Sequence, residues 1–565
     1  MEMIIKNGIV YDPANGINGE KMDICIKDGK IVEKVSEDAK VIDASNCVVM
    51  PGGVDPHSHI AGPKVNTGRV MRPEDSIMEI YKRKAHSGTG FSVPSTYKTG
   101  YQYSELGYTF VVEAAMPPLK AKHVHEEFRD TPQIEKTAMP LFGNNWFVFE
   151  YIKEGDFKAL AAYIAWVLKV SRGYAIKIVN PGGTEAWGWG TNVHSVDDPV
   201  PGFDITPREI ISGLAKANEM LGLPHSIHIH PNNLGHPGNW ETTLETMKIV
   251  EGMKAKPRVG NRFQVYHNTH VQFHSYGGTS WKDFEAKGVE IAEYVNKADN
   301  ITIDVGQITL DETTTMTADG PMEFDLYMTT KTKWANCDVE VETGSGVVPF
   351  IYSPKGPVYS LQWAIGLELF LYTDVDKLML TTDHPNAGPF TRYPRVIAWL
   401  MSKKYRDEWL YNKVHKWAQQ RSRIADSDKE FDLYEITKIT RTNSARAFGL
   451  VNKGHLGIGA DADIAIYEIN PEEKDGRVIE RAFRYAKYTI KKGEILVKDG
   501  ELVKEKFYET WYVDVNVGEQ LYEEVLKDIK AKWPKLYSIA FENYPVKDSY
   551  ANGWEVVKID ASDIN

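Results

Sequence analysis

Two histidines separated by one residue, His57 and His59, lie in the segment PGGVDPHSH near the start of the chain. On a β-strand, residues i and i+2 point to the same face, so these imidazoles can converge on one metal ion. Such a pair arises often by chance, and two polar loop residues would look the same. Further ligands must therefore come from elsewhere in the chain.

Four more polar residues lie at or near the ends of short apolar runs. They are Lys177 in YAIKIV, His230 in SIHIH, His270 in FQVYHNTH and Asp383 in LMLTTDHP. Four imidazoles and one carboxylate suit Zn²⁺, and also Mn, Fe, Ni or Co. The lysine is the exception, because a protonated amine would repel metal cations. It requires either a catalytic role or conversion to an anionic ligand, as addition of CO₂ to give a carbamate would provide.

Neighbouring histidines leave parts of this set open. A shift of one strand pleat would exchange His228 for His230, and we favour His230 because it comes last before a loop. His267 and His270 form a second pair of alternatives. His274 could contact a substrate or be a hydrogen-bonded structural histidine.

These residues need a scaffold that gathers strand ends. From about residue 51 to 450, apolar runs alternate with helical patterns such as the amphipathic segment 241–253, as in βα units around a parallel sheet. Eight parallel strands close a (β/α)8 barrel, whose active site lies at the carboxyl ends of the strands. The sequence therefore predicts an α/β fold with a TIM-like barrel at residues 51–450. We count eight candidate strands, in VVMPGGVDPHSH, TFVVEAAM, AMPLFG, YAIKIV, SIHIH, FQVYHNTH, ITIDVGQI and LMLTTDHP.

Both ends of the chain have short β patterns. The dipeptides Asp28-Gly29, Lys492-Gly493 and Asp499-Gly500 stand where two-residue hairpin turns would connect strands. We therefore predict a composite β-domain built from residues 1–50 and 451–505. Residues 506–565 form an aromatic-rich C-terminal extension with one helix and no alternating strands, which either packs over the barrel or contacts a partner chain.

PGGVDPHSH resembles the first-strand signature of the amidohydrolase superfamily, and the order His-x-His, Lys, His, His, Asp resembles its binuclear branch. Over about residues 1–503 this resemblance implies the barrel, the composite β-domain and two divalent metal ions, with zinc as the expected identity. It also favours His270 over His267, since HNTHV is similar to the His-x-x-His-Val of cyclic amidases. The implied ligands are His57, His59 and Asp383 for one metal and His230 and His270 for the other, with Lys177 as N6-carboxylysine bridging both beside a nucleophilic hydroxide.

The runs PGGVDPHSHIAGPKVNTGR, THVQFHSYGGTSW and NPGGTEAWGWG, together with the long extension, resemble the A-type subunits of formylmethanofuran dehydrogenases of methanogenic archaea. The resemblance implies interconversion of formate plus methanofuran with formylmethanofuran. Lys177 and Asp383 are then the catalytic residues, with Asp383 moving the proton. It further implies partner subunits that carry a tungsten or molybdenum pterin and iron–sulfur clusters.

Six residues are candidates for binding the substrate. Lys64, Asn66 and Arg69, in a loop after the histidine pair, could meet its carboxylates, although solvated loop charges would look the same. Trp187 and Trp189 could line the space for its ring, and core packing is the alternative. His274 completes this set.

Composition excludes several other classes. The chain of 565 residues has a net charge of −12 and no long basic run, which argues against nucleic acid as a partner. Three cysteines are too few for an ordinary iron–sulfur cluster, so we expect neither such a cluster nor a pterin in this chain, and a reducing compartment.

No secretory signal is visible at the N-terminus, and the apolar segments 159–170 and 358–372 are too short to span a membrane. We therefore expect a cytoplasmic protein. The alternative functions are those of a self-contained cyclic amidase of the hydantoinase or dihydroorotase kind and of a non-catalytic scaffold in a larger complex.

Overall fold

Each of the eight apolar runs contains or overlaps one strand of a parallel sheet in the computed structural model, which describes residues 2–75, 90–337 and 340–564. The first run also contains β5 (Val48–Pro51), which belongs to another sheet. The strands pair in parallel within two groups. Isolated parallel bridges, Leu141 with Lys177 and Ser58 with His384, connect the two groups at both sides. The first group is β6 (Gly53–Ser58), β7 (Tyr108–Met116) and β8 (Glu135–Pro140), and the second is β9 (Lys177–Val179), β10 (Ile227–His230), β11 (Tyr266–Asn268), β14 (Ile301–Asp304) and β18 (Leu378–Met379).

Helices separate these strands, which confirms the mixed α/β class. The start of α8 shows how local sequence sets a helix: the Thr206 hydroxyl and the Glu209 carboxylate cap each other's backbone N–H groups, and Gly222 ends the helix at φ 64°. The predicted helix at 241–253 is present but ends five residues earlier, as α9. The helices that follow the strands include α3 (Thr96–Glu105), α4 (Ala121–Arg129), α5 (Trp146–Glu154), α6 (Phe157–Ser171), α8 (Pro207–Leu221), α9 (Asn239–Lys248), α10 (Gly288–Lys297), α12 (Pro357–Tyr372) and α13 (Tyr393–Met401).

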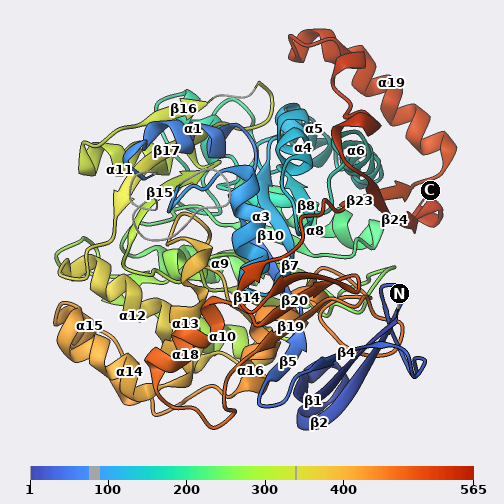
Figure 1. Cartoon of the computed structure of the whole chain (residues 1–565). Helices are drawn as coiled ribbons and strands as arrows, with labels where there is room; N and C mark the ends of the chain where they lie inside the picture. Colours follow the sequence, from blue (N-terminus) through green and yellow to red (C-terminus); the bar gives the residue numbers. More distant parts are fainter. Residues whose placement is uncertain (1, 76–89, 338–339, 565) are drawn as a thin grey trace.

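Strands from both ends of the chain form one nine-stranded sheet, in the order β22-β21-β20-β19-β5-β1-β2-β3 with β4 beside β1. Blue and orange segments meet there in the lower part of Figure 1. All three predicted hairpin turns are confirmed, because each of the six turn residues has a positive φ between 46° and 81°. The strands are β1 (Glu2–Asp12), β2 (Ile17–Lys27), β3 (Lys30–Val32), β4 (Lys40–Asp43), β5 (Val48–Pro51), β19 (Ile464–Tyr467), β20 (Tyr488–Lys491), β21 (Glu494–Lys498) and β22 (Glu501–Leu502).

The C-terminal extension contains two strands that the sequence pattern did not predict. β23 (Thr510–Asn516) pairs in parallel with β8 on one side and with β24 (Trp554–Asp560) on the other. The predicted helix is α19 (Glu519–Leu536), the red helix at the upper right of Figure 1. Trp166 of α6 stacks on Phe541 and Tyr544 of the extension, with ring planes within 12°. Much of the aromatic content of the extension is therefore used in packing on the body of the chain.

An insertion between β14 and β18 was also missed. It consists of β15 (Glu312–Thr317), α11 (Gly320–Thr330), β16 (Ala335–Cys337) and β17 (Ser345–Ile351), and its three strands form an antiparallel sheet. The apolar segments 159–170 and 358–372 belong to α6 and α12. Within the part of the chain that the structure describes, no helix is both long enough and apolar enough to span a membrane.

Candidate metal centre and active site

The histidine pair and the aspartate meet in the structure. His57 lies on β6, His59 follows it directly, and Asp383 lies four residues beyond β18. The Oδ1 atom of Asp383 is 3.0 Å from Nε2 of His57 and 3.3 Å from Nε2 of His59. Nε2 of His57 and Oδ1 of Asp383 have no hydrogen-bond partner among the described residues. These buried atoms face one another as metal ligands do.

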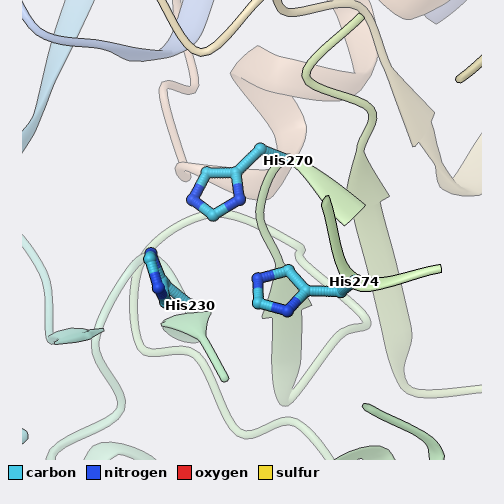
Figure 2. A group of neighbouring side chains, drawn as sticks. All are labelled: His230, His270 and His274. Carbon is cyan, nitrogen blue, oxygen red and sulfur yellow. The ribbon is translucent and has the colours of Figure 1, made fainter. Parts of the chain in front are cut away.

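A second group consists of His230, His270 and His274. Figure 2 shows their rings gathered around a common space. The ring centres of His230 and His270 are 4.9 Å apart, and the ring of His274 is 5.4 Å from each. The two groups adjoin, because Nε2 of His270 is 3.9 Å from Oδ2 of Asp383. Neither ring nitrogen of the buried His274 has a hydrogen-bond partner among the described residues, which argues against a hydrogen-bonded structural histidine.

The backbone is strained at this junction. His270 has a φ of 34° and Asp383 a φ of 46°, in the left-handed region that side chains other than glycine rarely adopt. A Cβ atom on Gly306 would lie 2.4 Å from Cβ of His270, so only glycine allows the loop after β14 to come this close. The carboxylate of Asp304 accepts a hydrogen bond from the backbone N–H of His270 at 2.9 Å.

Lys177 begins β9, although we expected it near the end of its strand. It pairs with His228 on β10 and is bridged to Leu141. Its Nζ atom is buried and has no hydrogen-bond partner among the described residues. Burial lowers the pKa of Lys177 to about 7, against the opposing influence of Asp383. A neutral amine, the form that can add CO₂, is therefore accessible at neutral pH.

Burial also sets the charge of the other groups. It lowers the pKa of His57, His230 and His270, which favours neutral imidazoles with lone pairs free to bind a metal. It raises the pKa of Asp383, whose Oδ2 accepts a hydrogen bond from Nδ2 of Asn386 at 2.9 Å. Unpartnered imidazole and carboxylate atoms in a closed interior fit divalent metal ions such as Zn²⁺.

The alternative histidines have other partners. Nε2 of His228 lies 2.8 Å from Nδ1 of His57, on the side of that ring away from Asp383. His267 contacts Asp304 through Nε2 at 2.9 Å and Thr302 through Nδ1 at 2.8 Å. Both therefore lie behind the residues that we assigned as ligands.

The proposed substrate cations lie on a helix, which corrects the predicted loop. They belong to α1 (Pro63–Met71). Nζ of Lys64 is buried and donates to Glu113 at 2.8 Å and to the Ala115 carbonyl at 2.6 Å, while Arg69 pairs with Glu127 at 2.8 Å. Neither is a solvated loop charge. Asn66 is exposed.

The two predicted tryptophans do not line the pocket described below. Trp187 lies on α7 (Gly183–Gly188), where its ring centre is 5.9 Å from that of Phe324. Trp189 follows the helix and is 70% exposed. Packing is thus the role that the structure shows for Trp187.

A pocket of about 480 Å³ includes His230 and Asp383 in its wall. Most of the wall is apolar, so the pocket suits a ligand that brings an apolar or aromatic body to the polar cluster. Sequence reasoning missed this wall, because its residues come from separate segments and share no motif. The large apolar residues in it are Leu234, Phe273, Trp281, Met322, Leu326, Phe350, Tyr352 and Tyr359.

Comparison with known proteins agrees with this geometry. Residues 40–497 match the model of the amidohydrolase family. The chain is 76% identical to protein FwdA of Methanocaldococcus jannaschii, over 100% of both chains. It is 37% identical to the FhcA component of the formyltransferase/hydrolase complex Fhc of Methylorubrum extorquens, over 88% of this chain and 89% of that one.

A crystal structure shows the same fold. The formyltransferase/hydrolase complex FhcABCD of Methylorubrum extorquens, determined in complex with methylofuran, contains a chain that superposes with a TM-score of 0.88. The match has 33% sequence identity and covers 99% of this chain and 100% of the other. The chain belongs to the amidohydrolase family and, within it, to the FwdA family.

Proposed function

We propose that this chain interconverts a formyl amide with formate and an amine, as the A-type subunit of a formylmethanofuran dehydrogenase, with methanofuran as the amine. The observation that carries the proposal is the apolar pocket whose wall includes His230 and Asp383. Nε2 of His230 lies 3.1 Å from Oδ2 of Asp319, whereas Oδ1 of Asp383 has no hydrogen-bond partner among the described residues. Whole-chain similarity to FwdA and to a component of a complex that binds methylofuran supports this substrate class.

We further propose that the two parallel strand groups form one (β/α)8 barrel. The bridges Leu141–Lys177 and Ser58–His384 lie at the two junctions where such a barrel would close. The division into residues 1–50 with 451–505, 51–450 and 506–565 remains a prediction, as do cytoplasmic localisation and partner subunits with a tungsten or molybdenum pterin and iron–sulfur clusters.

Two divalent metal ions, expected to be zinc, would be held by the predicted residues. His57, His59 and Asp383 would hold one and His230 and His270 the other, with Lys177 as the carboxylated bridge. His274 is positioned to contact either the second metal or the substrate. When bound, the metals would polarise the formyl carbonyl and lower the pKa of a water molecule toward about 7.

Asp383 is the group that we assign to proton transfer. In hydrolysis, water adds to the formyl carbon and the C–N bond breaks. Asp383 accepts the proton that water loses and delivers it to the departing amine nitrogen. Its hydrogen bond from Asn386 holds the carboxylate in place while its other oxygen faces the histidines. Synthesis runs through the same steps in reverse.

The test is release of formate from N-formylmethanofuran, or from a furfurylformamide surrogate, by the purified metal-loaded chain. We expect release by the wild type and a loss of at least about 100-fold in the Asp383→Ala variant, as expected for removal of a general acid–base group. The control is Asp325→Ala, which changes a pocket carboxylate that is not in the cluster.

Turnover of hydantoins or dihydropyrimidines without action on formyl amines would instead identify a cyclic amidase. Metal-free protein after purification without chelator, together with inactivity on both substrate types, would favour the scaffold alternative.

A further inference from the structure

Three buried histidines form a continuous hydrogen-bonded chain behind the metal cluster. Nδ1 of His225 is 2.7 Å from the carbonyl oxygen of Ala447. Nε2 of His225 is 3.0 Å from Nδ1 of His228, and Nε2 of His228 is 2.8 Å from Nδ1 of His57. Nε2 of His57, at the end of the chain, faces Asp383.

The Ala447 carbonyl gives this chain a direction. It ends α17 (Asn443–Ala447), and the last carbonyls of a helix lack intrahelical partners. A carbonyl can only accept, so Nδ1 of His225 must carry the proton. The ring of His225 is also held by stacking on Phe448, with ring centres 3.8 Å apart and planes within 9°.

The remaining tautomers then follow one from another. A neutral imidazole has one donor and one acceptor, so Nε2 of His225 accepts from Nδ1–H of His228. Nε2 of His228 in turn accepts from Nδ1–H of His57. Nε2 of His57 is left with its lone pair toward Asp383.

Two other readings of the contacts fit less well. His57, His228 and Asp304 could be taken as a separate metal group. However, Nδ1 of His57 and Nε2 of His228 are hydrogen-bonded to each other at 2.8 Å. Both carboxylate oxygens of Asp304 also have partners, the backbone N–H of His270 and Nε2 of His267. The hydroxyl of Thr269 lies 2.6 Å from Nδ1 of His57 but can donate or accept, so it does not select a tautomer.

We infer that His225 and His228 are positioning residues, which transmit the hydrogen-bond direction of the Ala447 carbonyl to His57 and keep Nε2 of His57 ready to bind a metal ion. The inference rests on the metal site of the proposed function but not on formyl chemistry. Binding affinity for Zn²⁺ therefore tests it separately from formate release.

The experiment compares Zn²⁺ affinity, by chelator competition, in full-length His228→Leu, His228→Gln and wild-type protein. Leucine removes both polar contacts, and loss of such an outer partner typically weakens metal binding about 10- to 100-fold. Glutamine has an NH₂ group that can donate and a carbonyl oxygen that can accept, so it should retain most of the affinity. His125→Leu is the matched control, because His125 is equally buried and its ring contacts the Ser171 carbonyl, Phe128 and Trp554, away from the cluster.

The inference would be overturned if His228→Leu bound Zn²⁺ as tightly as the wild type. It would also be overturned if folded His228→Gln and His228→Leu lost the same amount of Zn²⁺ affinity. If Thr269→Val lost more Zn²⁺ affinity than His228→Leu, Thr269 would be the residue that positions His57. If His228→Leu does not fold, His225→Leu serves in its place, since it keeps the His228 ring but frees its tautomer. We expect weaker Zn²⁺ binding there too, and unchanged binding would overturn the inference.

Discussion

Two buried polar clusters lie at opposite ends of the parallel strands and differ in how their atoms are satisfied. The candidate metal cluster lies toward the carboxyl ends and contains several atoms without partners among the described residues. The other cluster begins at Glu135, the first residue of β8, which contacts Lys453, Lys491 and Lys492. Asp461 and Asp463 add further ion pairs to Lys453, at 2.7 and 3.0 Å.

The second cluster connects parts of the chain. Glu135 belongs to the parallel strands and Lys491 to β20 of the nine-stranded sheet, and Asp463 directly precedes β19. Trp511, which donates to Glu135 at 3.1 Å, belongs to the extension. Burial alone would raise the pKa of Glu135, but the lysines hold it well below its usual range. Glu135, Asp461 and Asp463 are close enough to hold a metal, yet lysine ammonium groups already occupy the positions between them. Proximity of carboxylates alone therefore does not identify a metal site. The candidate metal site differs because ligand atoms of His57, His270 and Asp383 lack a hydrogen-bond partner among the described residues.

The largest effect is expected from Lys177→Ala, which tests the candidate metal cluster. Loss of the bridging ligand should lower bound metal and reduce formate release by more than about 100-fold, beyond the usual cost of an outer partner. Small carboxylic acids should restore part of both. Metal analysis and activity assays of the same preparation measure this, and full metal occupancy in the variant would remove the bridging role.

Lys453→Met tests the ion-paired cluster around Glu135. Removing the cation leaves buried carboxylates unpaired and should lower the free energy of unfolding by about 3–5 kcal/mol. Metal bound per folded chain should stay unchanged. Urea unfolding measures the loss, and Lys30→Met is the control: Lys30 pairs with Asp461 from a half-exposed position, where we expect less than about 1 kcal/mol. If Lys453→Met and Lys30→Met lowered the free energy of unfolding equally, the cluster around Glu135 would be no more important for stability than a half-exposed ion pair.

Glu368 of α12 provides a pH test away from both clusters. Burial raises its pKa to about 8, from an ordinary value of 4.5. Between pH 4.5 and 8, the Glu368 carboxyl is therefore protonated in the folded state and ionised in the unfolded state. The free energy of unfolding consequently falls as the pH rises from 4.5 to 8. Glu368→Gln should remove this dependence and raise the free energy of unfolding at pH 8 by on the order of 3 kcal/mol. Unfolding curves of the wild type and Glu368→Gln at pH 5 and 8 measure this difference. The same pH dependence of the free energy of unfolding in both proteins would contradict the prediction.

The smallest effect is expected from Asp383→Asn in metal-free protein. A buried carboxylate with an unpartnered oxygen contributes little to folding, so stability should stay the same or rise by about 1 kcal/mol. Chemical denaturation in the presence of chelator measures it. A destabilisation comparable to that of Lys453→Met would show that both clusters serve the fold.

Much of the fold follows from local patterns. The eight strand runs, the helix of the extension and the three hairpin turns were all predictable, because alternation and glycine-containing turns depend on neighbouring residues. The strands β23 and β24 were not, since β23 pairs with β8, more than 370 residues away, and β24 pairs with β23. The insertion between β14 and β18 was likewise missed.

The sequence by itself determined the chemical types in the candidate site and their order along the chain, because His-x-His and strand-end positions are local features. Only the tertiary structure decided which neighbouring histidines face the cluster and which stand behind it. It also placed Lys64 in an ion pair with Glu113 and built the pocket wall from separate segments. The physical reason is that burial and hydrogen-bond satisfaction depend on contacts between distant residues, such as the 2.8 Å contact of His57 with His228.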